Sequence, residues 1–127
     1  MQAIGAPNAD RPVVLFVDDE PIARKQFQRL VGPNIEVVCM GSAEEARRYM
    51  ERGVKHVSVM ICDHRMPNET GVELLTHARR RWPRSRRVLT TAYADTVALE
   101  ASINDAAVHR LIAKPWDGDA TRRIVHQ

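Results

Sequence analysis

Short apolar runs alternate with longer segments of helical periodicity along the whole chain. The runs are rich in valine and isoleucine, which favours β-strands. We therefore expect strands at residues 13–17, 35–39, 57–62, 87–91 and 109–113. In the segments between them apolar residues recur at helical spacing, which predicts helices near residues 21–31, 42–52, 71–82 and 95–105, and a last one from about residue 118.

Local signals support several of these helix boundaries. Pro21 suits the first turn of a helix, where a missing N–H leaves no hydrogen bond unmade. Ser42 and Glu45 have the spacing of a capping box at the start of the second helix, and Gly53 is a plausible end for it.

Five strand–helix units in succession predict an α/β fold with a doubly wound parallel sheet and helices on both faces. The first, third and fourth strands are continuous apolar runs, as expected for strands buried on both sides. In such sheets ligands bind at the carboxyl ends of the strands. The residues that end each strand are therefore the first candidates for function.

Length and composition are those of one soluble domain. The chain has 127 residues, of which 44% are apolar and 28% charged, and no apolar run approaches the roughly 20 residues of a membrane span. We expect a flexible leader at residues 1–11 and one domain at residues 12–127. Cys39 and Cys62 form no disulfide framework and suit a reducing cytoplasm as small core hydrophobes.

The formal net charge of +3 is unevenly distributed, because residues 78–87 contain six arginines. Such a run can form a nucleic-acid-binding patch, or it can be a solvated helix end. We favour the helix end, since no stacking aromatic residue other than Trp82 accompanies the arginines.

The predicted strand ends carry most of the candidate chemistry. They are Asp18-Asp19-Glu20 after the first strand, Asp63 after the third, Thr90-Thr91-Ala92 at the end of the fourth, and Lys114-Pro115 after the fifth. An anionic first loop would repel phosphate, which argues against a nucleotide-binding fold of this class. Glu20 stays open between a site residue and a simple acid at a helix start.

A hard divalent cation resolves the repulsion between these carboxylates. Mg²⁺, or Mn²⁺ in its place, takes carboxylate oxygens and can accept phosphoryl oxygens as well. Asp63 could then act as a carboxylate nucleophile that carries a phosphoryl group. Lys114 would pair with one phosphoryl oxygen, and the hydroxyl of Thr91 would donate to another.

Four motifs, "FVDDEP", "DHRMPNETG", "LTTAYAD" and "IAKPW", resemble the signatures of the response-regulator receiver domain of two-component signalling. The resemblance covers residues 12–127 and implies the strand order 2-1-3-4-5 with five helices. It makes Asp63 the phosphoacceptor, Asp18 and Asp19 the acidic pair that binds the metal with Asp63, and Lys114 the phosphate-binding lysine.

The resemblance assigns further roles near the site. It makes the backbone carbonyl of Arg65 a metal ligand and Thr91 the switch hydroxyl, and it makes Lys114–Pro115 a candidate cis peptide bond. Met66, Pro67 and Gly71 are expected to shape the loop after Asp63, with the glycine supplying backbone freedom.

Two positions bear on how the switch works. Many receivers carry an aromatic residue three positions before the lysine, where this chain has Leu111, so Tyr93 becomes a candidate substitute for the aromatic half of the switch. Arg65 and Tyr93 also stand where family side chains flank the path of the hydrolytic water. Because both are large, we expect the phosphoryl group to be lost slowly.

The resemblance implies a regulatory domain rather than an enzyme. A sensor histidine kinase or phosphotransfer protein is the expected donor, and an output domain in the same chain or a homodimer interface is the expected target. We expect no membrane partner, and contact with nucleic acid only through an output domain. The tail "LIAKPWDGDA" resembles receivers of multidomain regulators, including those with hydrogenase-type transcription outputs, and we expect the chain to be part of a longer protein.

Two other functional classes compete with this interpretation. A phosphatase of the haloacid dehalogenase type needs a second aspartate two residues after the nucleophile, where this chain has Arg65. A phosphorylation-independent protein- or nucleic-acid-binding module would usually have lost an acid or the lysine, and here Asp18, Asp63 and Lys114 are all present.

Overall fold

The computed structural model describes residues 13–52, 57–92, 95, 99–100 and 108–126. In chain order the elements are β1 (Val13–Val17), α1 (Pro21–Val31), β2 (Glu36–Met40), α2 (Ala43–Glu51), β3 (Val59–Asp63), α3 (Gly71–Arg81), β4 (Arg86–Ala92), β5 (Arg110–Lys114) and α5 (Gly118–His126). The described residues thus contain four helices, not the five expected. The helix expected near residues 95–105 falls mostly outside the described residues, as do the leader and Gly53.

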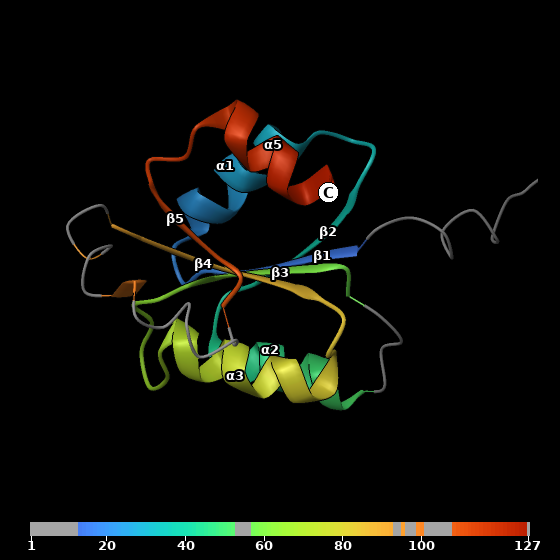
Figure 1. Cartoon of the computed structure of the whole chain (residues 1–127), viewed down its shortest axis with the longest axis vertical. Helices are drawn as coiled ribbons and strands as arrows, with labels where there is room; N and C mark the ends of the chain where they lie inside the picture. The colour runs from blue at the N-terminus through green and yellow to red at the C-terminus, as the bar shows by residue number, and fades with distance from the viewer. Residues whose placement is uncertain (1–12, 53–56, 93–94, 96–98, 101–107, 127) are drawn as a thin grey trace, which may run out of the picture.

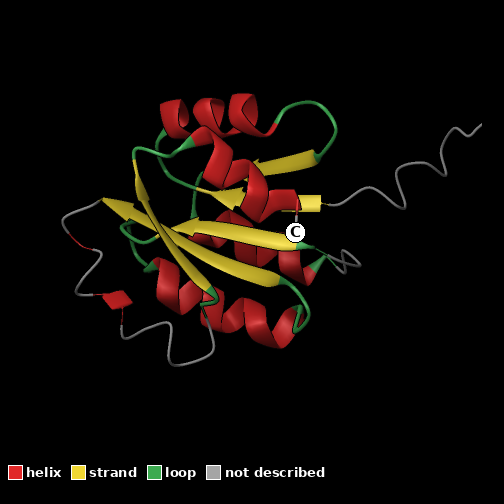
Figure 2. Ribbon diagram, turned by 45° about the horizontal axis from the view of Figure 1, so that its top comes forward, coloured by secondary structure: helices red, strands yellow, loops and turns green. Residues whose placement is uncertain are grey.

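The five strands form one sheet in the order β2-β1-β3-β4-β5, and every pair is parallel. This is the doubly wound order that the resemblance implied. Figure 1 shows α1 and α5 on one face of the sheet and α2 and α3 on the other, and Figure 2 shows the twist of the strands between them. The winding direction changes between β1 and β3, so their carboxyl ends border the ligand-binding edge.

Two apolar layers hold the helices to the sheet. On the α1/α5 face, Phe16 of β1 stacks on Phe27 of α1 with ring centroids 4.2 Å apart, and Trp116 meets Phe16 edge-on at 5.5 Å. On the other face, the core includes Met60 of β3 and Leu74 of α3, both fully buried. Truncating a buried ring such as Phe27 to alanine would cost about 3–5 kcal/mol in such a core.

Side-chain caps begin α2 and α3. The hydroxyl of Ser42 accepts the N–H of Glu45 at 3.1 Å, which is one half of the predicted capping box. A complete capping box occurs at α3, where Thr70 and Glu73 each bond the other's backbone N–H. The α3 cap ends the loop that follows Asp63, so it helps to fix one end of the candidate site.

Candidate functional site

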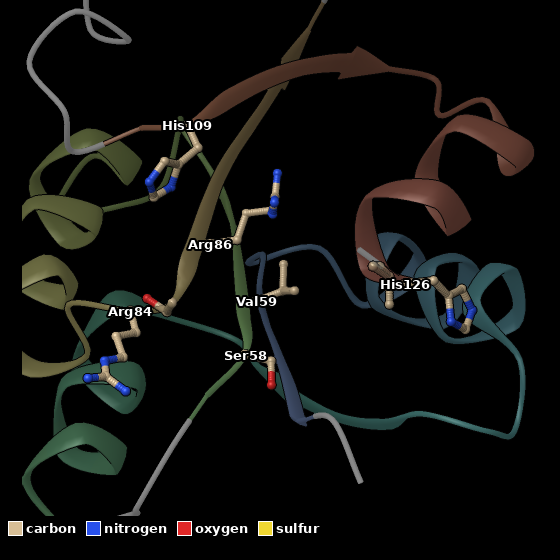
Figure 3. A pocket seen from close by; sticks show the side chains of 8 residues that line it. Ser58, Val59, Arg84, Arg86, His109 and His126 are labelled. Atoms are coloured by element: carbon tan, nitrogen blue, oxygen red, sulfur yellow. The ribbon is translucent and has the colours of Figure 1, made fainter.

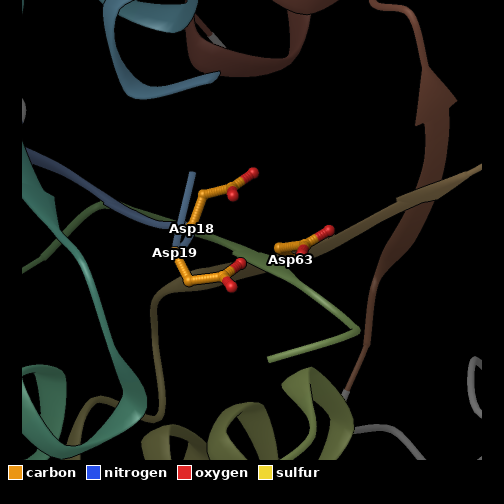
Figure 4. Close-up of side chains that lie close together, drawn as sticks. All are labelled: Asp18, Asp19 and Asp63. Carbon is orange, nitrogen blue, oxygen red and sulfur yellow. The ribbon is translucent and has the colours of Figure 1, made fainter. Parts of the chain in front are cut away.

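The register of the sheet brings Asp18 and Asp63 together. Val17 of β1 pairs with Cys62 of β3, so the residue that follows each lies at the same edge of the sheet. Figure 4 shows Asp18 and Asp19 from the end of β1 beside Asp63 from the end of β3. These acids are far apart in the sequence, and the parallel pairing of β1 with β3 brings them close together in space.

The three aspartates could hold a metal ion. One carboxylate oxygen from each of Asp18, Asp19 and Asp63 lies within 4.8 Å of the others. Asp18 is fully buried and Asp63 is 6% exposed, whereas Asp19 is exposed. Clustered carboxylates with one side open to solvent suit a hard divalent cation that keeps some of its waters, so the donor set fits Mg²⁺ or Mn²⁺.

Lys114 reaches the same carboxylates from the end of β5. Its Nζ lies 2.8 Å from Asp18 Oδ2, 3.2 Å from Asp63 Oδ1 and 3.7 Å from Glu20 Oε1. The protein itself therefore provides a cation to the acidic cluster, and a metal ion is not the only counterion available. The bond from Lys114 to Pro115 is cis, as predicted.

Burial and charge shift the pKa values of the two central groups. Burial raises the pKa of Asp63 to about 6, and the neighbouring charge of Asp18 adds to the effect while Lys114 opposes it. Burial lowers the pKa of Lys114, but its hydrogen bond and charge interaction with Asp18, together with the charge of Asp63, outweigh burial and raise it. The ammonium of Lys114 is therefore held in its charged form.

The two threonines at the end of β4 differ in their hydrogen bonds. Thr90 Oγ1 accepts a hydrogen bond from the indole Nε1 of Trp116 at 2.8 Å. Thr91 is 1% exposed, and its Oγ1 has no hydrogen-bond partner in the part of the chain that the structure describes. A buried hydroxyl without a partner costs about 1–3 kcal/mol. The hydroxyl of Thr91 is therefore available for a further acceptor.

The remaining predicted residues lie around this centre. The guanidinium of Arg65 forms a two-pronged ion pair with Asp95 at 2.8 and 2.9 Å, which joins the loop after β3 to the segment after β4. Leu111 pairs in register with Leu89 and packs against the core on the α2/α3 face. Tyr93 lies outside the described residues, and the role of the Arg65 carbonyl stays a prediction.

Arg24, which sequence reasoning did not single out, supports the site together with the backbone of Glu20. Arg24 Nη1 donates to the backbone oxygen of Asp18 at 2.7 Å, and the N–H of Glu20 donates to Asp18 Oδ1 at 3.0 Å. Glu20 itself stands at the N-cap of α1 without a side-chain cap. No local spacing rule marks Arg24, because its target is a backbone atom at the edge of the sheet.

Gly71 is required for a different reason from the one expected. Its backbone is not in the left-handed region, so conformational freedom is not what it supplies. A Cβ at this position would lie 2.5 Å from the carbonyl oxygen of Asp63 and 2.6 Å from Leu89 Cδ1. The absent side chain lets α3 approach the end of β3 closely, which the sequence alone did not reveal.

The arginine-rich segment does not form one outward face. Arg87 is buried and its Nη1 donates to the carbonyl of Ser85, while Arg81 Nε donates to the carbonyl of Met50 in α2. Figure 3 shows Arg84 and Arg86 beside a pocket of about 430 Å³ that also includes Ser58 and His109. This pocket lies at the start of β3 and β4, at the opposite end of the sheet from Asp63. It is therefore separate from the acidic cluster.

Among the helices of the described residues, none has the length and apolarity to cross a membrane. The fold and the site define the chain as a doubly wound α/β domain with an acidic, metal-compatible centre at the carboxyl edge of its sheet. The family model of the response regulator receiver domain matches residues 14–126. The chain therefore belongs to the receiver domain family of two-component response regulators.

Individual relatives agree with this assignment. The chain is 40% identical over 114 residues to the hydrogenase transcriptional regulatory protein HoxA of Cupriavidus necator, a match that covers 90% of the chain and 23% of HoxA. It is 32% identical to the transcriptional regulatory protein UhpA of Salmonella typhimurium, over 89% of the chain and 56% of UhpA. The chain thus spans about a quarter of one relative and just over half of the other.

Solved structures show the same fold. A response regulator receiver protein from Pseudomonas putida superposes with a TM-score of 0.77 at 28% identity, over 91% of the chain and 96% of that protein. A structure described as adenylate cyclase from Rhodopirellula baltica gives a TM-score of 0.83 at 25% identity, over 91% of the chain and 85% of that chain. Domains of this fold therefore occur in proteins that carry different functional names.

Proposed function

We propose that the chain is a phosphoacceptor switch in which Asp63 takes a phosphoryl group from a sensor histidine kinase or a phosphotransfer protein. The observation that carries the proposal is the position of Lys114 Nζ between Asp18 and Asp63, at 2.8 and 3.2 Å. This arrangement puts a cation, a buried carboxylate pair and the Thr91 hydroxyl, which has no partner among the described residues, at one edge of the sheet.

The transfer is a displacement at phosphorus. A carboxylate oxygen of Asp63 forms the new P–O bond, the P–N bond to the donor histidine breaks, and the electron pair of that bond returns to the imidazole nitrogen. With a pKa of about 6, Asp63 is mostly ionised at neutral pH and can act as the nucleophile. Lys114 then shares its charge with a phosphoryl oxygen, and Thr91 donates its hydroxyl to another.

The proposed metal ligands are the carboxylates of Asp18, Asp19 and Asp63 and the backbone carbonyl of Arg65. Mg²⁺ or Mn²⁺ bound there would neutralise charge on the transferring group and orient it. The hydrogen bonds to Asp18 from Arg24 and from the N–H of Glu20 hold this aspartate in place before any cation arrives.

A partly apolar surface lies beside the site. Ile22 of α1 is 71% exposed and borders a pocket of about 380 Å³, whose lining includes Ala23, Pro115, Trp116 and Lys114. An exposed isoleucine next to a partly apolar hollow is suited to a partner helix. We propose that the phosphodonor protein contacts this surface and so brings its histidine to Asp63.

The wider assignment extends the same proposal. We propose a receiver at residues 12–127, with a leader before it and a fifth helix near residues 95–105, as the phosphorylated part of a longer cytoplasmic transcription regulator. The resemblance to HoxA and UhpA, both transcriptional regulatory proteins by name, supports an output domain that follows in the same chain. Phosphorylation would shift the population of a state that binds the output domain or a second receiver, and only the output domain would contact nucleic acid.

One experiment tests the central claim. The chain is incubated with a small phosphodonor and Mg²⁺, and its intact mass is measured. We expect one added phosphoryl group, which is absent with a chelator and absent in Asp63→Asn. An unmodified wild-type chain would instead favour a phosphorylation-independent binding module, and a group retained in Asp63→Asn would exclude Asp63 as the acceptor.

A further inference from the structure

A two-pronged ion pair joins α2 to the loop that follows Asp63. Arg47 of α2 donates from Nε to Glu69 Oε1 at 2.8 Å and to Oε2 at 3.1 Å, and from Nη2 to Oε2 at 2.5 Å. The side chain of Arg47 is 37% exposed and that of Glu69 only 17%. This geometry matches the planar fork of a guanidinium to a carboxylate, which restricts orientation as well as distance.

Glu69 belongs to a loop of residues 64–70, called here the 64–70 loop, that runs from β3 to α3. The backbone hydrogen bonds around this loop include those from Gly71 N–H to the His64 carbonyl and from Glu69 N–H to the Pro67 carbonyl. Asn68 within it has a positive φ of 73°, a conformation that asparagine adopts more readily than most other non-glycine residues. The Arg47–Glu69 pair is a contact from outside the loop, made at the end opposite to the Arg65–Asp95 pair, and it adds to those that favour this conformation.

The ion pair stands beside the acidic cluster. Arg47 and Glu69 line the same pocket of about 320 Å³ as Asp19, together with Pro67 and Asn68. The 64–70 loop also carries Arg65, whose backbone carbonyl is the proposed fourth metal ligand. The position of this carbonyl relative to the aspartates depends on where the loop is held.

We infer that Arg47 and Glu69 are positioning residues for the cation site, and that their ion pair holds the 64–70 loop in the metal-binding arrangement. This inference rests on the proposed function, since it concerns the same metal site. It explains why a half-buried, two-pronged pair links α2 to this loop, whereas the Arg48–Glu44 pair on the same helix is exposed and lies within one element.

Charge alone makes the opposite prediction for one of the two residues. If Arg47 acted only through its charge, Arg47→Gln would strengthen cation binding, because it removes a positive charge near the aspartates. Glu69→Gln would weaken binding by the same reasoning, and the double variant would bind as the wild type does. If the pair positions the loop, each single variant weakens binding, and the double variant is no weaker than the singles because the same interaction is lost.

The test is a Mg²⁺ titration of the metal-free chain, followed by calorimetry, for Arg47→Gln, Glu69→Gln and the double variant. We expect the dissociation constant to rise about fivefold in all three, as loss of roughly 1 kcal/mol implies. Arg48→Gln removes the same charge from the exposed side of α2 and is the matched control, expected to remain within about twofold of the wild type. Hydrogen exchange without metal should be faster at the amides of residues 64–70 in the Arg47 and Glu69 variants than in the control.

The outcomes separate the two proposals. Opposite effects of the two single variants, or a double variant that binds like the wild type, would overturn the positioning role and leave the proposed function intact. Unchanged affinity in all variants would do the same. A wild-type chain that binds no Mg²⁺ would instead overturn the proposed function and this inference with it.

Discussion

Lys114 Nζ lies 2.8 Å from Asp18 Oδ2 and so joins the end of β5 to the end of β1, although β3 and β4 stand between these strands. The pair is 96 residues apart in the chain. It gives the buried Asp18 a charged partner and leaves Asp63 within reach of the same ammonium. The centre is thus a small network in which a cation from outside must share carboxylates with a lysine.

Removing the carboxylate of Asp63 should stabilise the chain in the absence of divalent cations. The pKa of Asp63 is raised to about 6 in the folded state, so folding disfavours its ionised form. Stability is therefore lost as pH rises from the unfolded value of about 4 through 6, and the full cost is present above pH 6. We expect Asp63→Asn to gain about 1–2 kcal/mol at neutral pH, less than the full shift implies because Lys114 loses one partner.

Urea unfolding with a chelator, at about pH 7.5 and again near pH 4, measures this effect. The gain should be present at the higher pH and largely absent at the lower one. Asp119→Asn, which alters an exposed carboxylate of α5, is the control and should show no such pH-dependent gain. A variant that is less stable than the wild type at neutral pH would contradict the expectation.

Replacing Lys114 with glutamine should destabilise the chain strongly. The fully buried Asp18 would lose its cation, and breaking a buried pair in this way typically costs about 3–5 kcal/mol. Mg²⁺ should then restore more stability to the variant than to the wild type, because the cation replaces the missing charge. Thermal unfolding with and without Mg²⁺ tests this prediction, which fails if both chains gain equally.

The neighbouring threonines should respond differently to the same substitution. Thr91→Val removes a buried hydroxyl that has no partner in the described structure, so stability should be unchanged or rise by about 1 kcal/mol. Thr90→Val breaks the bond from Trp116 and should cost about 1 kcal/mol. Denaturant unfolding compares the two variants.

In the response to phosphorylation, Thr91→Val should have the larger effect and Thr90→Val the smaller one, which is the reverse of their expected effects on stability. Thr91→Val should still accept a phosphoryl group from a small donor, yet show smaller amide shifts on phosphorylation because the hydroxyl no longer donates to it. Thr90→Val should retain those shifts. Full wild-type shifts in Thr91→Val would exclude Thr91 as the switch hydroxyl.

The lifetime of the phosphoryl group should depend on the two large side chains near the water path. Replacing both Arg65 and Tyr93 with small residues should speed its loss, since water would reach the phosphoryl group more easily. Asp95→Asn provides a related variant, because it frees the guanidinium of Arg65 without removing it. Intact-mass measurements over time after removal of the donor report the lifetime, and unchanged decay in the double variant would contradict the prediction.

Most of the secondary structure could be predicted from the sequence. β1 and α1 have the predicted bounds, and the other described elements differ by one or two residues at their ends. These elements have strong local causes, such as the apolar run of residues 13–17 and Pro21 at the start of α1. The expectation of doubly wound topology followed from the alternation of elements, and the motif resemblance added the strand order.

The contacts that support the site could not be predicted from the sequence in this way. Arg24 bonds a backbone carbonyl, Arg47 bonds Glu69 across two elements, and Gly71 is needed because α3 passes close to the Asp63 carbonyl. Each of these depends on the distance between elements, which no periodicity or spacing encodes. The same holds for the arginine-rich segment, whose members point in different directions once α3 ends and β4 begins.

The sequence by itself determined the elements, their parallel winding and the residues that end each strand, because hydrophobic periodicity and turn chemistry are local properties of the chain. The motif resemblance had already grouped these residues into one site, and the tertiary structure decided how they contact one another. It brought Lys114 between Asp18 and Asp63, left the hydroxyl of Thr91 buried without a partner in the described structure, and joined α2 to the 64–70 loop. The physical reason is that burial and the register of neighbouring strands set distances, and these in turn set the charges and pKa values on which the site depends.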